Sequence, residues 1–246
     1  MLRLSEKSFL GGIMKKLLLT GITLLFAGLH VFAGDAAAFV DLGISRDGKT
    51  YAFAEYGKTD RQYQGYAEIY TVDIEKNDFV SGEVFKTQPS AATVSKSGKS
   101  VYDELLKKAE WKLRKYEFKP AAVDNLLYVR DDKKSGESEI VFKDFEGSTV
   151  EQSVFYHIKL EKNVEGTSSN LRSSFFITLE KQDGEGKLIT RNIVGSPDIK
   201  RKLVTDYRIY RIFSDKSGRN LVFVIEKTLS DVNGSSIRYM VETIRL

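Results

Sequence analysis

The sequence predicts a mainly β protein: an antiparallel meander, a sandwich or a curved open sheet, with propeller-blade-like hairpins and one amphipathic helix. Two observations predict this fold class. Short apolar or alternating segments recur between turn residues, which is typical of strands. Glycines follow turn-forming residues between these segments, where a tight hairpin needs positive φ; these pairs are Asp47-Gly48, Asp183-Gly184, Ser217-Gly218 and Asn233-Gly234.

The N-terminus predicts export. Met14, the second possible start, opens a stretch with two lysines and an apolar run that ends at Ala33, which is typical of a secretory signal. We expect residues 1–33 to be cleaved after Ala33, although small residues also permit a cut after Ala38. The apolar run is interrupted and marginal for a span of about 20 residues. Residues 34–246 should therefore form a single exported domain, periplasmic or secreted, without a transmembrane span.

Charge and cysteine content exclude several functions. The chain has a net charge of +4, and residues 1–33 carry four cations and one carboxylate, so the mature chain keeps only +1. Nucleic-acid binding needs a basic footprint on the folded domain, which this charge does not provide. The absence of cysteine excludes disulfides, thiolate catalysis and zinc–thiolate sites. We expect no cofactor.

The strands are placed by their apolar patterns and by the turn-forming residues between them. All three prolines, Pro89, Pro120 and Pro197, fall in expected connections rather than in central strands. We expect strands near residues 38–45, 49–56, 66–75, 125–130, 138–145, 150–162, 172–181, 187–194, 204–213, 219–228 and 236–245.

One segment, SVYDELLKKAEWKLRKYEFKP, predicts a helix over about residues 100–117. Ser100 is the expected N-cap, Asp103 gives a variant of the capping box, and Pro120 follows the end. At about 100° per residue the apolar side chains form one stripe that should pack on a sheet; the stripe contains Tyr102, Leu105, Leu106, Ala109, Leu113 and Tyr116.

A small or incomplete β-propeller is the alternative fold. The hairpin at residues 42–57, LGISRDGKTYAFAEYG, resembles a hairpin of a propeller blade. One later stretch of the sequence, IFSDKSGRNLVFVIEKT, is similar to it. Blades recur every 40 to 45 residues or so, whereas Ile44 and Phe213 in the two hairpins are 169 positions apart. The spacing therefore favours two separate hairpins with the same turn chemistry.

Residues suited to catalysis or metal binding are few. His157 is the single histidine of the mature chain, and strand alternation puts it on a mixed, solvent-facing side. No nucleophile-elbow motif accompanies it, and a histidine-based metal site would lack ligands. Carboxylates are plentiful, so a glycosidase-like pair stays open. We assign no catalytic, metal-binding or cofactor-binding residue.

A tyrosine-rich segment, YGKTDRQYQGYAEIY, has two interpretations. Aromatic rings beside planar polar groups can bind sugars or peptides, or the tyrosines can cover a sheet edge next to a polar hairpin loop. The residues concerned are Tyr56, Tyr63, Tyr66 and Tyr70 around Asp60, Arg61 and Gln64.

The outer face of the helix is the candidate interaction site. Trp111, the only tryptophan, falls about 180° from the apolar stripe. Its neighbours are Lys107, Lys108, Arg114 and Lys115, which suit an anionic partner. An envelope protein, an anionic lipid surface or a cell-wall polymer would fit. In the opposing interpretation, a loop or a second sheet covers Trp111, and the lysine side chains complete the packing around it.

Three stretches resemble a family of bacterial predicted secreted proteins, domain of unknown function 2259. They are GDAAAFVDLGISRDGKTYAFAEYG, GYAEIYTVDIEKNDFVSGEVF and IRYMVETIRL. The resemblance implies export and a shared fold, and it brings no known activity. We therefore expect an exported, non-enzymatic binding module, with a carbohydrate- or cell-wall-acting hydrolase that uses paired carboxylates as the alternative.

Overall fold

The computed structural model describes residues 35–131, 139–231 and 234–246. The expected signal peptide, Gly34 and the turn residue Asn233 lie outside the described residues. The strands in chain order are β1 (Asp35–Ala36), β2 (Ala38–Ile44), β3 (Thr50–Lys58), β4 (Gly65–Asp73), β5 (Asp78–Thr87), β6 (Leu126–Val129), β7 (Ile140–Lys143), β8 (Val154–Glu165), β9 (Arg172–Asp183), β10 (Leu188–Lys202), β11 (Val204–Ser214), β12 (Asn220–Asp231) and β13 (Gly234–Arg245). The helix α2 spans Gly98–Leu113.

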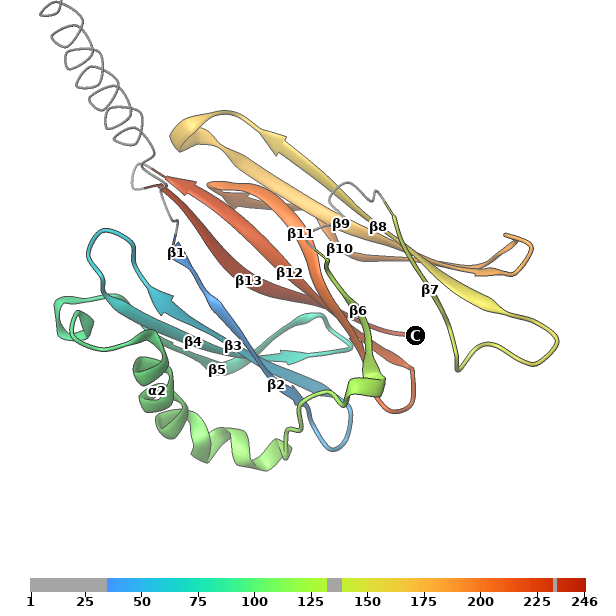
Figure 1. Cartoon of the computed structure of the whole chain (residues 1–246), viewed down its shortest axis with the longest axis horizontal. Helices are drawn as coiled ribbons and strands as arrows, with labels where there is room; N and C mark the ends of the chain where they lie inside the picture. The colour runs from blue at the N-terminus through green and yellow to red at the C-terminus, as the bar shows by residue number, and fades with distance from the viewer. Residues whose placement is uncertain (1–34, 132–138, 232–233) are drawn as a thin grey trace, which may run out of the picture. The chain divides into compact units, whose positions relative to one another are not determined.

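The strands form three sheets (Figure 1). The first has the order β2-β3-β4-β5, the second β10-β9-β8-β7, and the third β1-β13-β12-β11-β6. Every neighbouring pair is antiparallel except β1 and β13, which are parallel. The expected mainly β meander with one amphipathic helix is confirmed.

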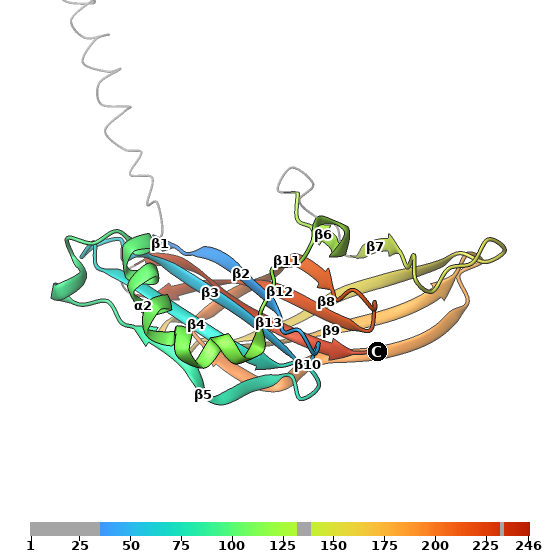
Figure 2. The same cartoon turned by 90° about the horizontal axis from the view of Figure 1, so that it is seen from below.

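The elements stack as successive layers (Figures 1 and 2). The helix packs on one face of the β2–β5 sheet. The other face of that sheet packs against the β11–β13 sheet, which in turn packs against the β7–β10 sheet. Sheets stacked face to face in this order are not blades around an axis, so the propeller alternative does not describe the protein.

Strand β12 shows why the middle sheet has two buried faces. Its residues Leu221, Phe223 and Ile225 belong to the core shared with β7–β10. Val222 and Val224, which alternate with them, belong to the core shared with β2–β5. Side chains of a strand point alternately to opposite faces, so the continuous apolar run LVFVI is what a central strand buried on both sides requires.

The helix begins slightly earlier than expected. Its N-cap is Ser97, whose side chain accepts the backbone N–H of Ser100, so the prediction of Ser100 as the cap is wrong. Asp103 pairs with Lys99 instead of closing a capping box. The apolar stripe packs on the sheet as expected, with Tyr102, Leu105, Ala109 and Leu113 buried. Tyr116 falls in the short 3₁₀ turn that follows the helix.

Strands β1 and β5 were not expected from the sequence. In β5 the Ser81-Gly82 step breaks the alternation, and Gly82 has a φ of 71° where pairing with β4 shifts register. The prediction that Pro197 lies in a connection is also wrong. It lies inside β10, an edge strand whose pairing to β9 is interrupted between Ser196 and Arg201. An edge position tolerates the missing N–H of proline.

The hairpin glycines follow the expected turn chemistry at three of the four positions. Gly48, Gly218 and Gly234 all have positive φ. In the β9–β10 hairpin, Gly186 rather than Gly184 has the positive φ, at 84°. The turn is therefore placed two residues later than the Asp183-Gly184 pair suggested.

Candidate functional site

The edge of β13 in the middle sheet is open over most of its length. Strand β1 pairs with β13 only at Ser236 and Ile237. Further along, the Tyr239 N–H donates to the Glu55 carboxylate at 2.6 Å, and the Thr243 N–H donates to Asn77 Oδ1 at 2.7 Å. Side chains thus satisfy backbone donors that a neighbouring strand would otherwise pair, which protects an exposed edge.

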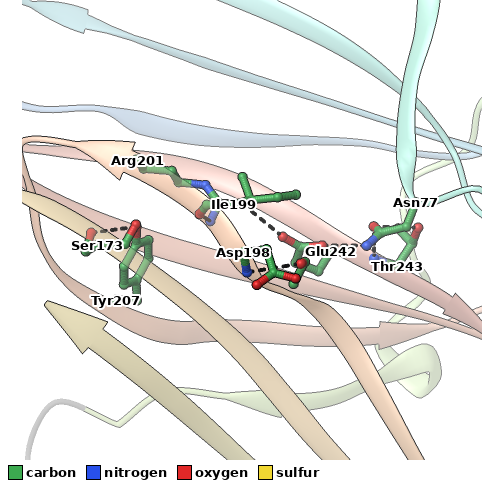
Figure 3. Close-up of polar contacts among 9 residues, drawn as sticks. Asn77, Ser173, Asp198, Ile199, Arg201, Tyr207, Glu242 and Thr243 are labelled. Carbon is green, nitrogen blue, oxygen red and sulfur yellow. Dashed lines mark hydrogen bonds and ion pairs between the residues drawn. The ribbon is translucent and has the colours of Figure 1, made fainter.

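Glu242 is a buried carboxylate on this strand (Figure 3). It lies on β13, its side chain is 7% exposed, and Arg201 Nη2 of β10 approaches its Oε1 at 3.4 Å. The Asn77 amide, from the β4–β5 turn, donates to Oε2. Burial raises the pKa of Glu242, and the Asn77 hydrogen bond and the Arg201 charge oppose that shift. One carboxylate therefore ties together elements of all three sheets.

Aromatic packing holds Arg201 at this junction. The guanidinium lies 4.9 Å from the centre of the Phe175 ring and 6.0 Å from that of Tyr207. The Tyr207 hydroxyl is in turn 2.8 Å from Ser173 Oγ (Figure 3). These contacts make Arg201 a cation–π partner as well as an ion-pair partner, so its position depends on the core between β9 and β11.

A cavity of about 450 Å³ adjoins the Glu242 junction. Strand β10 contributes Gly195, whose φ is 81° and whose absent Cβ would lie 3.4 Å from the Glu242 carboxyl carbon. A larger residue there would be strained and would press on the carboxylate. The cavity is lined by Glu75, Asn77, Ile193, Val194, Gly195, Thr243, Ile244, Arg245 and Leu246.

Two other carboxylates face each other across neighbouring strands. Glu55 of β3 and Glu68 of β4 are directly opposite in the register. Burial raises the pKa of Glu55, and Lys227 opposes this shift. Glu68 accepts hydrogen bonds from Tyr70 and Lys86. Sequence reasoning missed this pair, although alternation in TYAFAEYGK puts Glu55 on the same buried face as the core aromatics of β3.

The tyrosine-rich segment does not form one aromatic cluster. Tyr66 is buried beneath the Arg238 guanidinium, 4.3 Å from its ring centre. Tyr56 stacks on Tyr102 of the helix at 5.3 Å, and Tyr63 is 65% exposed. The polar residues of the loop line a cavity of about 260 Å³ together with β1 and β13; its lining residues are Asp35, Thr59, Asp60, Arg61, Gln62, Gly234, Ser235, Ser236 and Arg238.

His157 lies on β8, on the face away from the core, as the alternation predicts. Its Nδ1 is 3.1 Å from a Glu139 carboxylate oxygen. Within residues 35–131, 139–231 and 234–246, histidine and carboxylate side chains form no group of three that could hold a metal ion. The histidine therefore takes part in a surface ion pair or hydrogen bond to one carboxylate.

The predicted interaction residues lie on α2 and the turn after it and are exposed, although Lys115 reaches back to the buried Glu83 of β5. Trp111 is 72% exposed, and the Lys112 ammonium lies 5.3 Å from its ring centre. Arg114 pairs with Glu110 at 3.0 Å, and Lys115 pairs with Glu83 at 2.6 Å. Lys107 and Lys108 are exposed.

Among the described residues, no helix is both long and apolar enough to cross a membrane. The protein is a mainly β domain of stacked sheets, with an outer helix that carries the exposed Trp111. The chain belongs to the family of predicted secreted proteins called domain of unknown function 2259, whose family model matches residues 52–245. The family resemblance is thereby confirmed. No curated protein matches the chain.

Proposed function

We propose that the protein is a non-enzymatic binding module that docks on an anionic lipid surface through the outer face of α2. The exposure of Trp111, at 72%, carries this proposal. A large ring left in water on a helix whose opposite stripe packs on a sheet is a candidate anchor. Tryptophan is also a side chain favoured at the interface between lipid and water.

The charge distribution supports the same face. Residues 98–116 contain six lysines or arginines and three carboxylates, a net charge of +3. Because residues 34–246 sum to +1, the rest of the mature chain sums to −2. A surface of anionic headgroups would therefore attract the helix and not the remainder of the domain. Such attraction is screened by salt, so docking should be reversible and weaker at high ionic strength.

Co-sedimentation with vesicles tests the proposal. The purified mature protein is mixed with vesicles of phosphatidylcholine alone or with added phosphatidylglycerol, at low and high salt. We expect binding only to the anionic vesicles at low salt, and we expect Lys107→Glu with Lys108→Glu to abolish it. The matched control, Lys187→Glu with Lys216→Glu, makes the same charge change at exposed lysines outside α2. Equal loss in both double variants, or no binding at all, would overturn the proposal.

A hydrolase that acts on a carbohydrate or cell-wall polymer remains a second candidate, because Glu55 and Glu68 are opposite each other and burial raises the pKa of Glu55. Two carboxyl groups close to each other are the arrangement that glycoside hydrolysis needs. The test is release of reducing ends from purified cell-wall polymer. Activity lost in Glu68→Gln and kept in the exposed-site variant Glu75→Gln would favour this candidate, and an inactive wild-type protein would remove it.

A further inference from the structure

We propose that the mature protein retains Asp35 and begins upstream of it, and that residues 35–37 form a latch that fastens the start of the domain to its C-terminal hairpin. The expected cut after Ala33 leaves this segment in place, whereas the alternative cut after Ala38 removes it. The proposal is independent of the docking function of α2, because it concerns the face of the β2–β5 sheet that is turned away from α2 and a different set of residues.

The first support is the environment of the Asp35 carboxylate. Its side chain is only 8% exposed, and Arg238 Nη2 donates to it at 2.6 Å. The Tyr66 hydroxyl donates to its other oxygen at 3.0 Å. A buried carboxylate with a cationic and a neutral donor has its charge compensated. Asp35 is therefore built into the domain as a core ion-pair partner would be.

Arg238 depends on this partner. Its guanidinium stacks over the Tyr66 ring at 4.3 Å and also donates from Nη1 to the Asp35 carbonyl at 3.3 Å. The Arg238 side chain is 21% exposed, so loss of Asp35 would leave a largely buried cation without its carboxylate. Removing one member of such a pair is strongly destabilising.

Backbone pairing and burial extend the latch to the next residues. Asp35 and Ala36 pair in parallel with Ser236 and Ile237 of β13. The Ala37 N–H donates to the Ile237 carbonyl at 3.1 Å, and Ala37 itself is 7% exposed within the core between the β2–β5 sheet and the middle sheet. A cut after Ala38 would delete the only strand that pairs with the outer edge of β13 among the described residues.

Two readouts on the exported protein test the proposal. Intact-mass analysis of the protein expressed with its own N-terminus is expected to give a chain that starts at Gly34. Thermal unfolding of the same material is expected to show that Asp35→Asn lowers the melting temperature by about 6 °C or more, because it breaks a buried pair in a domain of this size.

Asp60→Asn is the matched control, since Asp60 is an exposed carboxylate that lines the same cavity as Asp35. It should leave the melting temperature within about 1 °C of the wild type. A mature mass that starts at Phe39, or at any residue after Asp35, would overturn the assignment of the cut. A Gly34 start combined with equal melting temperatures for Asp35→Asn and Asp60→Asn would overturn the latch.

Discussion

Replacement of Glu242 by alanine should loosen the point at which the three sheets meet. The Glu242 side chain is 7% exposed and accepts from Asn77 and Arg201, and Arg201 is itself only 19% exposed. The variant leaves a partly buried guanidinium and a turn amide without their acceptor. Removing one partner of a buried pair costs about 3–5 kcal/mol, and the 3.4 Å ion-pair distance and the aromatic contacts of Arg201 favour the lower end.

The assay is thermal unfolding followed by circular dichroism. About 3 kcal/mol corresponds to a fall in melting temperature of roughly 6–12 °C for a domain of this size. Glu75→Ala is the control, because Glu75 lines the cavity that adjoins the Glu242 junction but its side chain is 77% exposed. That variant should unfold within about 2 °C of the wild type. Equal melting temperatures for the two variants would refute the view that Glu242 ties the sheets together.

Three further predictions concern backbone strain, pH and the sheet edge. Gly43→Ala should prevent soluble expression, because Gly43 has a φ of 102° and the new Cβ would lie 1.7 Å from the Lys119 carbonyl oxygen. Gly186→Ala is the control, since nothing lies within 4 Å of the new Cβ there. Similar soluble yields for the two variants would contradict the prediction. Because burial raises the pKa of Glu242, the extra stability that its protonation gives the folded state is complete below the ordinary pKa of a glutamate and is lost as pH rises. In urea unfolding, the stability of Glu242→Gln relative to the wild type should therefore increase from about pH 4 to about pH 8, and a difference that does not change with pH would disprove this. Pro197→Val should restore a donor on the β10 edge and promote self-association by light scattering, whereas a monomeric variant would show that proline does not guard that edge.

Local patterns were sufficient to predict most of the fold. Alternation and turn glycines placed the long strands, and the helical stripe placed the buried face of α2, because both signals depend on residues close together in sequence. Strand β5 was missed because Gly82 interrupts its alternation. Strand β1 was missed because its pairing with β13 joins the two ends of the domain, and such long-range pairing has no local sequence signal.

The buried polar groups were harder to predict. Nothing near Glu242 in sequence indicates Asn77, 165 positions away, or Arg201, 41 positions away. These contacts exist because the β4–β5 turn and the β10 edge meet over the open edge of β13. Helical geometry alone puts Trp111 opposite the packed stripe, but the sequence left open whether a loop or second sheet covers it, and only the structure shows that it is 72% exposed.

Fluorescence of Trp111 tests the proposed docking function most directly, because this is the only tryptophan in the chain. We expect the free mature protein to show red-shifted emission that iodide quenches readily. Vesicles that contain phosphatidylglycerol should shift the emission to the blue and protect it from iodide, while vesicles of phosphatidylcholine alone should not. Emission that stays red-shifted and fully quenchable with anionic vesicles would contradict the proposal that this face of α2 binds an anionic lipid surface.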